Sequence, residues 1–459
     1  MADMNNIKKY KCLNCTAPIE FSAKTGKLKC DFCGSSFELS DYEGNIEKEA
    51  AGDAKSAFEA QKDWATDENM QFFKCPSCAA VIMCDTQTAA TTCPYCDNPL
   101  VAEKKFSGAL KPEYIIPFRV QKKALPSTLS NFYDGRPLLP DLFTDKNHIE
   151  ETKGVYVPFY FFDGTANGTA IFNAQTSSTK RSGNTETTTT KYYECIRSGS
   201  VNFSKVPVDA SVQMDDAMMD SIEPFHFNEL KDFSTGYLPG YFADVCDVSV
   251  DECKERANTR CTATFADTMR ASVTGFSCVT KKSINSKVTY DKIHYGLLPV
   301  YILNTKFKDK NFQFAINGQT GKIVGELPID KGKSRKHFIF DLVRYFVLGI
   351  ILAYSLMMAT EWNGIISLAV LFSIIFSLIH RRIEHSQMKT VAIAGSASHY
   401  ATNTVFSNKE DKYLRSSTST RTISTSSGSG SGSGSGSSYR GRSSGGGGRS
   451  SGGGAGGRW

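Results

Sequence analysis

Eight cysteines near the start of the chain are spaced as metal ligands. They form four Cys-x-x-Cys pairs: Cys12 and Cys15, Cys30 and Cys33, Cys75 and Cys78, and Cys93 and Cys96. In both sets, fourteen residues separate the two pairs. A Cys-x-x-Cys turn places two thiolates beside a metal, and a hairpin returns two more. Four thiolates close a tetrahedral Zn²⁺ shell and leave no position for substrate water. The spacing therefore predicts two structural zinc ribbons, at 10–40 and 73–102.

Other ligand and metal assignments are less favoured. A Cys₄ iron site or an iron–sulfur cluster uses the same donors, but ribbons with this spacing usually hold zinc. Cys84 lies inside the second hairpin, and we interpret it as a packed thiol and not as a fifth ligand. A module of about 25 residues cannot build a sufficient core, so metal binding should stabilise each ribbon. The predicted cofactors are two structural zinc ions.

Composition and charge narrow the functional classes. The chain has 459 residues, enough for two or three domains, and its net charge of +6 argues against a strongly basic nucleic-acid binder. Nine of its fourteen cysteines precede residue 97, and thiolates kept for metal imply a reducing compartment. The first ten residues lack the apolar stretch of a signal peptide. We therefore expect the N-terminal part to be cytoplasmic.

Between the ribbons and after them the pattern changes. The segment 41–72 predicts a helical connector, and 112–331 predicts a β-rich α+β domain with duplicated strand motifs. An aromatic or apolar phrase around a proline recurs in this domain, at Pro117, Pro158, Pro239 and Pro299. Because proline cannot donate to a strand ladder, we expect these residues at strand starts or sheet edges. Helices are expected near 127–133 and 249–269, and a hairpin at 312–327.

The central domain offers no catalytic constellation. It contains no phosphate-binding loop of the GxxxxGK[ST] type. His148, His226 and His294 stand alone in the sequence, and a lone histidine in a β domain is more often structural than a catalytic base. Asp163 and Asp244 follow two of the proline phrases and fit turn caps. We therefore predict no catalytic residues, no cofactor-binding residues apart from the zinc ligands, and no enzymatic activity.

An apolar segment follows the central domain. Residues 345–379 contain a single charge, Glu361, and would be about 52 Å long as one helix, too long for one span of a hydrocarbon core of about 30 Å. The pattern predicts a two-helix membrane hairpin at 342–380 with a turn at 361–364. Lysines and arginines flank the segment on both sides, which places both termini in the cytoplasm. A re-entrant hairpin and a buried helical pair are the alternatives. The predicted localisation is the cell membrane, multi-pass with two spans, and 386–459 is predicted to be a disordered Ser/Gly/Arg tail.

The motifs together resemble a family of bacterial membrane proteins described as TFIIB-type zinc ribbon-containing proteins. The resemblance covers roughly 10–385 and rests on 11–15 with 29–35, on 88–96, and most specifically on 153–163. The chain departs from the usual ribbon turns at Thr16 and Ala79, where glycine is common. Relatives of this family resemble partners of phage-shock-protein A and of SPFH-domain scaffolds, which implies a role in envelope-stress response.

Two functions follow as expectations. The first is a membrane-anchored zinc-ribbon scaffold that recruits protein partners at the cytoplasmic face of the bilayer, with phage-shock-protein A-like or SPFH-domain proteins as candidates. The alternative is nucleic-acid binding by the ribbons, because Lys8, Lys9, Lys11, Lys27 and Lys29 make the first ribbon basic. The second ribbon is not basic, so we favour the scaffold.

Overall fold

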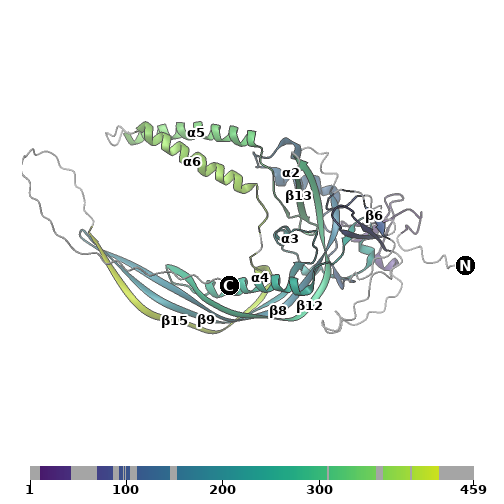
Figure 1. Ribbon diagram of the computed structural model, residues 1–459, viewed down its shortest axis with the longest axis horizontal. Helices are drawn as coiled ribbons and strands as arrows, with labels where there is room; N and C mark the ends of the chain where they lie inside the picture. The colour runs from purple at the N-terminus through teal and green to yellow at the C-terminus, as the bar shows by residue number, and fades with distance from the viewer. Residues whose placement is uncertain are drawn as a thin grey trace, which may run out of the picture. The chain divides into compact units, whose positions relative to one another are not determined.

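The structure is a computed structural model (Figure 1). It describes 11–42, 70–85, 92–96, 98, 100–103, 111–144, 152–307, 310–357, 365–392 and 395–422. The predicted connector helix within 41–72 and the final part of the predicted tail, 423–459, lie outside the described residues. The chain divides into two compact units, one of 1–176 with 192–415 and one of 177–191 with 416–459.

A small sheet forms the first ribbon. Its strands are β1 (Glu20–Ser22), β2 (Lys27–Lys29) and β3 (Ser36–Phe37), in the order β1-β2-β3, followed by the short helix η1 (Leu39–Asp41). Neighbouring strands are antiparallel. The apolar side chains that close this module are few, namely Ile19, Phe21, Leu28 and Tyr42, and they pack around Cys12 and Cys30. A core of this size agrees with a module that depends on metal.

A sheet of twelve strands forms most of the remaining structure. The order along the sheet is β10-β7-β12-β8-β11-β5-β4-β6, with β13 and β14 added beside β12, and β9 and β15 added beside β8. The long strands β8, β12, β9 and β15 are labelled in Figure 1. The bounds are β4 (Met70–Lys74), β5 (Val81–Asp85), β6 (Val101–Glu103), β7 (Tyr114–Ile115), β8 (Lys153–Ser182), β9 (Thr185–Asp209), β10 (Lys231–Asp232), β11 (Phe242–Asp244), β12 (Cys278–Phe307), β13 (Lys310–Asn317), β14 (Ile323–Gly325) and β15 (Ala401–Thr422).

Helices and short 3₁₀ turns complete the described structure. The helices are α2 (Leu125–Tyr133), α3 (Asp216–Ile222), α4 (Val250–Ala271), α5 (Lys331–Met357) and α6 (Ile365–Gln387), and the turns are η3 (Lys122–Ala124), η4 (Asp141–Thr144), η6 (Phe227–Glu229), η7 (Thr235–Tyr237) and η8 (Ser398–Tyr400). Ser249 caps α4 by accepting a hydrogen bond from the Glu252 amide. Cys253, Ala257, Cys261 and Phe265 of α4 are fully buried, which confirms the face predicted from their spacing of four.

The prediction that the proline phrases mark strand starts or edges is wrong for Pro158 and Pro299. Both lie inside long strands, where Leu297 pairs with Pro158 and Pro299 pairs with Tyr156. The reason is that each long strand has a short parallel partner that ends just before the proline. β11 pairs with β8 through Val155 and Tyr156, and β7 pairs with β12 through Gly296 and Leu297. Because β11 and β7 end before the prolines, Pro158 and Pro299 need no N–H to pair with them, and their missing N–H groups interrupt no ladder with these strands.

The predicted membrane hairpin at 342–380 is wrong, and so is the predicted two-span cell-membrane localisation. Among the helices that the structure describes, none combines the length and the apolar character that crossing a bilayer requires. The physical reason is that ionisable side chains lie well inside both helices. Asp341 and Arg344 lie within α5, and α6 contains His380 and Glu384. The apolar part of each helix is therefore shorter than the stretch of about 20 residues that a span needs.

The predicted disordered tail at 386–459 is wrong for its first part. α6 continues to Gln387, and η8 and β15 follow, with β15 paired to β9. The polar composition of this segment did not predict its structure, because main-chain pairing and a few specific side-chain contacts, and not a large apolar face, stabilise it. The Arg197 guanidinium lies 2.7 Å from the Asp411 carboxylate, and the Tyr193 and Tyr413 rings meet edge to face at 5.6 Å.

Candidate metal centres

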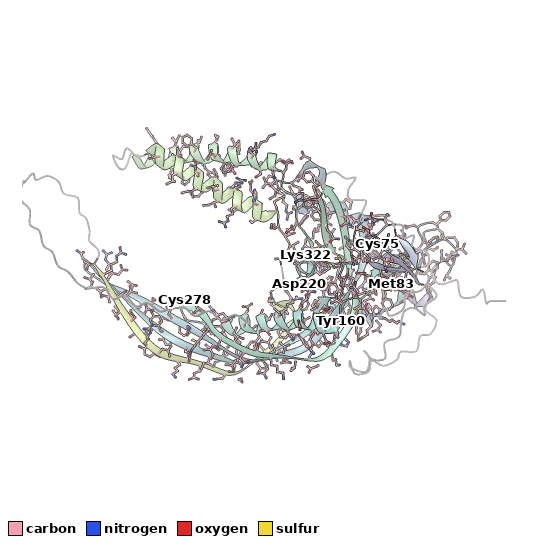
Figure 2. The ribbon with its side chains drawn as sticks, in the orientation of Figure 1. Cys75, Met83, Tyr160, Asp220, Cys278 and Lys322 are labelled. Carbon is pink, nitrogen blue, oxygen red and sulfur yellow. The ribbon has the colours of Figure 1, made fainter. Side chains whose placement is uncertain are left out.

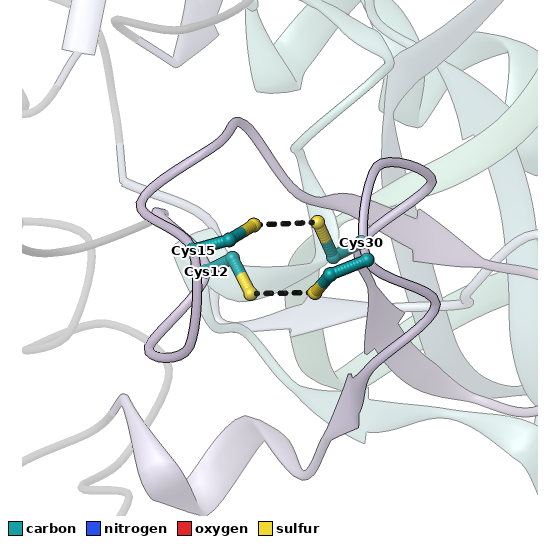
Figure 3. Close-up of side chains that lie close together, drawn as sticks. Cys12, Cys15 and Cys30 are labelled. Atoms are coloured by element: carbon teal, nitrogen blue, oxygen red, sulfur yellow. Dashed lines mark hydrogen bonds between the residues drawn. The ribbon is translucent and has the colours of Figure 1, made fainter.

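The first cysteine set converges at one end of the small sheet. The Sγ atoms of Cys12 and Cys33 lie 3.4 Å apart, and those of Cys15 and Cys30 lie 3.5 Å apart (Figure 3). All four Sγ atoms lie within 4.8 Å of one another. Zinc–sulfur bonds of about 2.3 Å in a tetrahedron separate the sulfur atoms by roughly 3.8 Å. The donor set and its separations therefore fit a single metal ion.

The second cysteine set has the same arrangement. The Sγ atoms of Cys75 and Cys96 lie 3.5 Å apart, those of Cys78 and Cys93 lie 3.7 Å apart, and all four lie within 4.8 Å of one another. Cys84 is buried in β5 and is not a member of this group. The structure thus brings all eight predicted ligands together in two clusters, each of which could hold one metal ion.

Each pair of ligands sits on the same backbone turn. In all four turns the amide of the first cysteine donates to the carbonyl five residues later, namely Cys12 to Ala17, Cys30 to Ser35, Cys75 to Ala80 and Cys93 to Asn98, at 2.8 to 2.9 Å. These hydrogen bonds fix the turn without using the thiolates. The backbone therefore presents both sulfur atoms of a pair in the same direction.

An amide and a hydroxyl bridge the two turns of each cluster, with their positions exchanged. The Asn14 amide donates to the Ser35 hydroxyl at 2.8 Å in the first ribbon, and the Asn98 amide donates to the Ser77 hydroxyl at 3.1 Å in the second. The residue after the second turn also reaches a ligand. Ser35 Oγ lies 3.2 Å from Cys33 Sγ, and Asn98 Nδ2 lies 3.3 Å from Cys96 Sγ. Such contacts orient the thiolates and hold the two turns together.

In three of the turns a described residue lies in the left-handed backbone region, and the equivalent residue of the fourth, Asp97, lies outside the described residues. The residue four positions after the first cysteine has φ of 62° at Thr16, 74° at Gly34 and 63° at Ala79. Its amide donates back to the cysteine carbonyl in each case. Only glycine adopts this region without strain. Thr16 and Ala79, where the chain departs from the usual glycine, therefore keep the turn geometry at an energetic penalty.

We expect Ala79→Gly to stabilise the second ribbon by about 1 kcal/mol, because removing Cβ relieves the left-handed strain. Gly34→Ala should destabilise the first ribbon by a similar amount. A Cβ at Gly34 would meet no atom within 4 Å, so strain and not a clash would be the cause. Competition with a chelator, together with denaturant unfolding, measures both effects. Two changes of the same sign would contradict this interpretation.

The second ribbon is part of the large sheet. Its strand β5 pairs with β11, with Met83 opposite Ala243, and Figure 2 marks Cys75 and Met83 in this region. Side chains from other segments bind its turns. Lys153 Nζ donates to the Cys93 carbonyl at 3.0 Å, and Asn304 Nδ2 donates to the Tyr95 carbonyl at 3.1 Å. The second cysteine cluster is therefore built onto the body of the protein.

Tyr95 anchors this attachment through a buried carboxylate. The hydroxyls of Tyr95 and Ser211 both donate to Oδ2 of Asp244 at 2.5 Å, and the Val245 amide donates to Oδ1 at 2.9 Å. Asp244 is buried. Burial raises the pKa of Asp244 to about 7, although the hydroxyls of Ser211 and Tyr95 oppose the shift. The predicted turn cap is thus the centre of a buried network.

The first ribbon rests on the segment that precedes β11. The Phe21 amide donates to the Pro239 carbonyl at 3.1 Å, and the Phe21 ring meets the Tyr237 ring edge to face at 5.2 Å. A Cβ on Gly236 would lie 2.3 Å from Cδ2 of Leu39, so a larger residue there would require the Leu39 side chain to move. The single segment 235–244 therefore contacts both ribbons, the first before Phe242 and the second from Phe242 onward.

His294, which stands alone in the sequence, has two acidic partners in the fold. Its Nδ1 lies 3.0 Å from Glu113 Oε2, and its Nε2 lies 3.8 Å from Asp163 Oδ2. Asp163 also accepts a hydrogen bond from the Lys205 amide. Glu113 is distant from His294 in the chain, and the two meet because β12 pairs with β7 and β8. No local spacing could have predicted this contact. His148 lies outside the described residues.

The fold and the clusters define a β-rich protein in which two tetracysteine ribbons, each able to hold a metal ion, are attached to one large sheet. The chain is similar to a protein of Bacillus subtilis (strain 168) described as "Uncharacterized protein YdjG". The two are 30% identical over 329 residues, which cover 72% of this chain and 92% of the relative. The chain belongs to the YdjG family. No family model matches it, and no solved structure does.

Proposed function

We propose that the chain is a zinc-stabilised scaffold that recruits a protein partner through its first ribbon. Both clusters would hold zinc, because four thiolates at tetrahedral separations suit this ion best. Four protein ligands leave no open coordination position, so the zinc ions would act structurally and not in catalysis. We also propose that the chain is not an enzyme.

One comparison between the ribbons carries the proposal. The second turn of each ribbon has an aromatic residue directly before its last cysteine, Phe32 in the first and Tyr95 in the second. Tyr95 is docked on Asp244 and Ser211 of the protein's own body. Phe32 is 87% exposed, and Leu13, at the tip of the other turn, is 56% exposed. Tyr95 thus contacts the protein's own body, whereas Phe32, at the equivalent position of the first ribbon, is exposed to solvent.

The chemistry of this surface favours a protein partner. Exposed apolar tips on a rigid, metal-fixed turn present area to a binding pocket with little loss of side-chain entropy. Two of the lysines that suggested nucleic-acid binding are paired with acids. Lys27 Nζ lies 2.5 Å from Glu38 Oε1, and Lys29 Nζ lies 3.3 Å from Asp31 Oδ1. These pairs weaken the positive field that binding of phosphates would need.

The resemblance to TFIIB-type zinc ribbon-containing proteins suggests the first partners to test. Phage-shock-protein A-like and SPFH-domain proteins would be purified and titrated against the full chain, after affinity capture has identified which of them is enriched. We expect Phe32→Ser to weaken the binding at least ~10-fold, because truncating a central aromatic anchor costs about 2 kcal/mol or more.

The matched control is Val405→Ser, which removes a 52% exposed apolar side chain from β15 and leaves the first ribbon intact. It should not change the dissociation constant. A partner that binds Phe32→Ser as tightly as the wild type would overturn the proposed binding surface. A salt-dependent affinity for DNA or RNA without any protein partner would favour the nucleic-acid alternative instead.

A further inference from the structure

A second type of ligand set lies between the helices α5 and α6. Each helix has a histidine and a carboxylate four residues apart, His337 with Asp341 on α5 and His380 with Glu384 on α6. Residues four apart lie on the same face of a helix. The two helices pack against each other in antiparallel order, so the histidine of one meets the acid of the other (Figure 1).

The four side chains converge. His380 Nδ1 lies 2.5 Å from Asp341 Oδ2, and His337 Nδ1 lies 3.3 Å from Glu384 Oε1. One ligand atom from each of Asp341, His380 and Glu384 lies within 4.8 Å of the other two. Three ligands in this arrangement could occupy one side of a metal ion, with His337 beside them as a further nitrogen donor.

Both carboxylates are buried, and in the described part of the chain their charged partners are the two histidines and one arginine. Asp341 is 4% exposed and Glu384 is 7% exposed. The guanidinium nearest to Asp341 is that of Arg344, 3.9 Å away, on a half-exposed side chain that lies over the Tyr345 ring. Arg381 is directed over the Phe338 ring at 5.5 Å. Buried carboxylates are usually paired or coordinate metals.

We propose that Asp341, His380 and Glu384 bind one divalent transition-metal ion, with water or His337 completing its coordination. Imidazole and carboxylate donors suit Zn²⁺, Mn²⁺ or Fe²⁺, in contrast to the purely thiolate ribbons. The site is chemically and spatially separate from both cysteine clusters.

Manganese is the probe that separates this site from the ribbons, because Mn²⁺ prefers oxygen and nitrogen donors to thiolates. The full chain, with zinc already bound by its ribbons, would be titrated with Mn²⁺ while electron paramagnetic resonance counts the free ion. We expect one bound Mn²⁺ per chain, and we expect Zn²⁺ to displace it, in line with the usual order of affinities.

Variants assign the ligands. Asp341→Asn, Glu384→Gln and His380→Gln should each weaken Mn²⁺ binding at least ~10-fold, since even contacts that only support a ligand have effects of that size. His385→Gln is the matched control: this histidine follows Glu384 and contacts Ser334, but it is outside the cluster. It should leave the affinity unchanged.

Circular dichroism and the thermal midpoint establish that each variant is folded. As a second measurement, Mn²⁺ should raise the thermal midpoint of the wild type and of His385→Gln, but not that of Asp341→Asn. Absence of Mn²⁺ binding to the folded wild type would overturn the proposal and leave two interhelical histidine–carboxylate pairs. Equal affinity in all folded variants would overturn it as well.

Discussion

Replacing Cys93 and Cys96 with serine is expected to remove one thiolate-bound metal ion and to destabilise the large sheet. Metal binding by small zinc modules contributes on the order of 10–16 kcal/mol at neutral pH, far more than a ribbon core can replace. The second ribbon shares strand β5 with the sheet, and its Tyr95 completes the network at buried Asp244. Loss of the metal should therefore expose a buried carboxylate and unpair an internal strand.

The matched change is serine at Cys12 and Cys15. The first ribbon has its own three-stranded sheet and contacts the body mainly through Phe21 with Tyr237 and Pro239. Its loss should leave the twelve-stranded sheet folded. Zinc released by thiol modification should fall from two ions per wild-type chain to one in either double mutant. Limited proteolysis should cut the twelve-stranded sheet of the mutant at Cys93 and Cys96, but not that of the mutant at Cys12 and Cys15. Mutants that retain two thiolate-bound ions would refute the metal assignment, and equal proteolysis would refute the difference between the ribbons.

Arg260→Leu is expected to lower the free energy of unfolding by about 3–5 kcal/mol, because it leaves a buried carboxylate without its partner. Arg260 of α4 is buried, and its guanidinium makes two hydrogen bonds to Glu223, at 3.0 and 2.6 Å. It also donates to the Pro207 carbonyl at 2.7 Å. The pair connects α4 to the end of α3 and to β9, so its loss should affect the body of the protein and not a surface element.

The dependence on pH tests this mechanism. Burial raises the pKa of Glu223 to about 7 even though Arg260 opposes the shift. A carboxyl with a raised native pKa stabilises the fold fully below its unfolded value near 4.5, and this contribution is lost as the pH rises toward 7. Without Arg260 the native pKa should rise further, so the defect of Arg260→Leu should be smallest near pH 5 and grow above pH 7.

Denaturant unfolding at several pH values measures this trend. The double variant Arg260→Leu with Glu223→Gln should recover part of the lost stability above pH 7, because no charge then remains buried at that position. A defect that does not depend on pH, or a double variant less stable than Arg260→Leu, would show that lost packing and not the unpaired carboxylate is the cause.

Local patterns were sufficient where the interacting residues are close in the chain. The two cysteine pairs of each ribbon lie on opposite ends of one short hairpin, so their spacing alone brings four thiolates together. The buried face of α4 follows from the helical period in the same way. The hydropathy of 345–379 wrongly indicated two membrane spans. The helices α5 and α6 extend beyond this apolar range and include ionisable side chains on either side of it. The polar composition of 401–422 was misleading because pairing with β9, which needs few apolar side chains, orders that segment.

The sequence by itself determined the eight metal-ligand candidates, the β-rich character of the chain and the buried face of α4, because each depends on the geometry of one turn, one strand or one helix. Only the tertiary structure decided that Tyr95 is docked while Phe32 is exposed, since both follow the same local pattern. It also decided which acids meet His294 and His380. Those contacts depend on the order of strands and on the packing of two helices, and both are set by the burial of residues far apart in the chain.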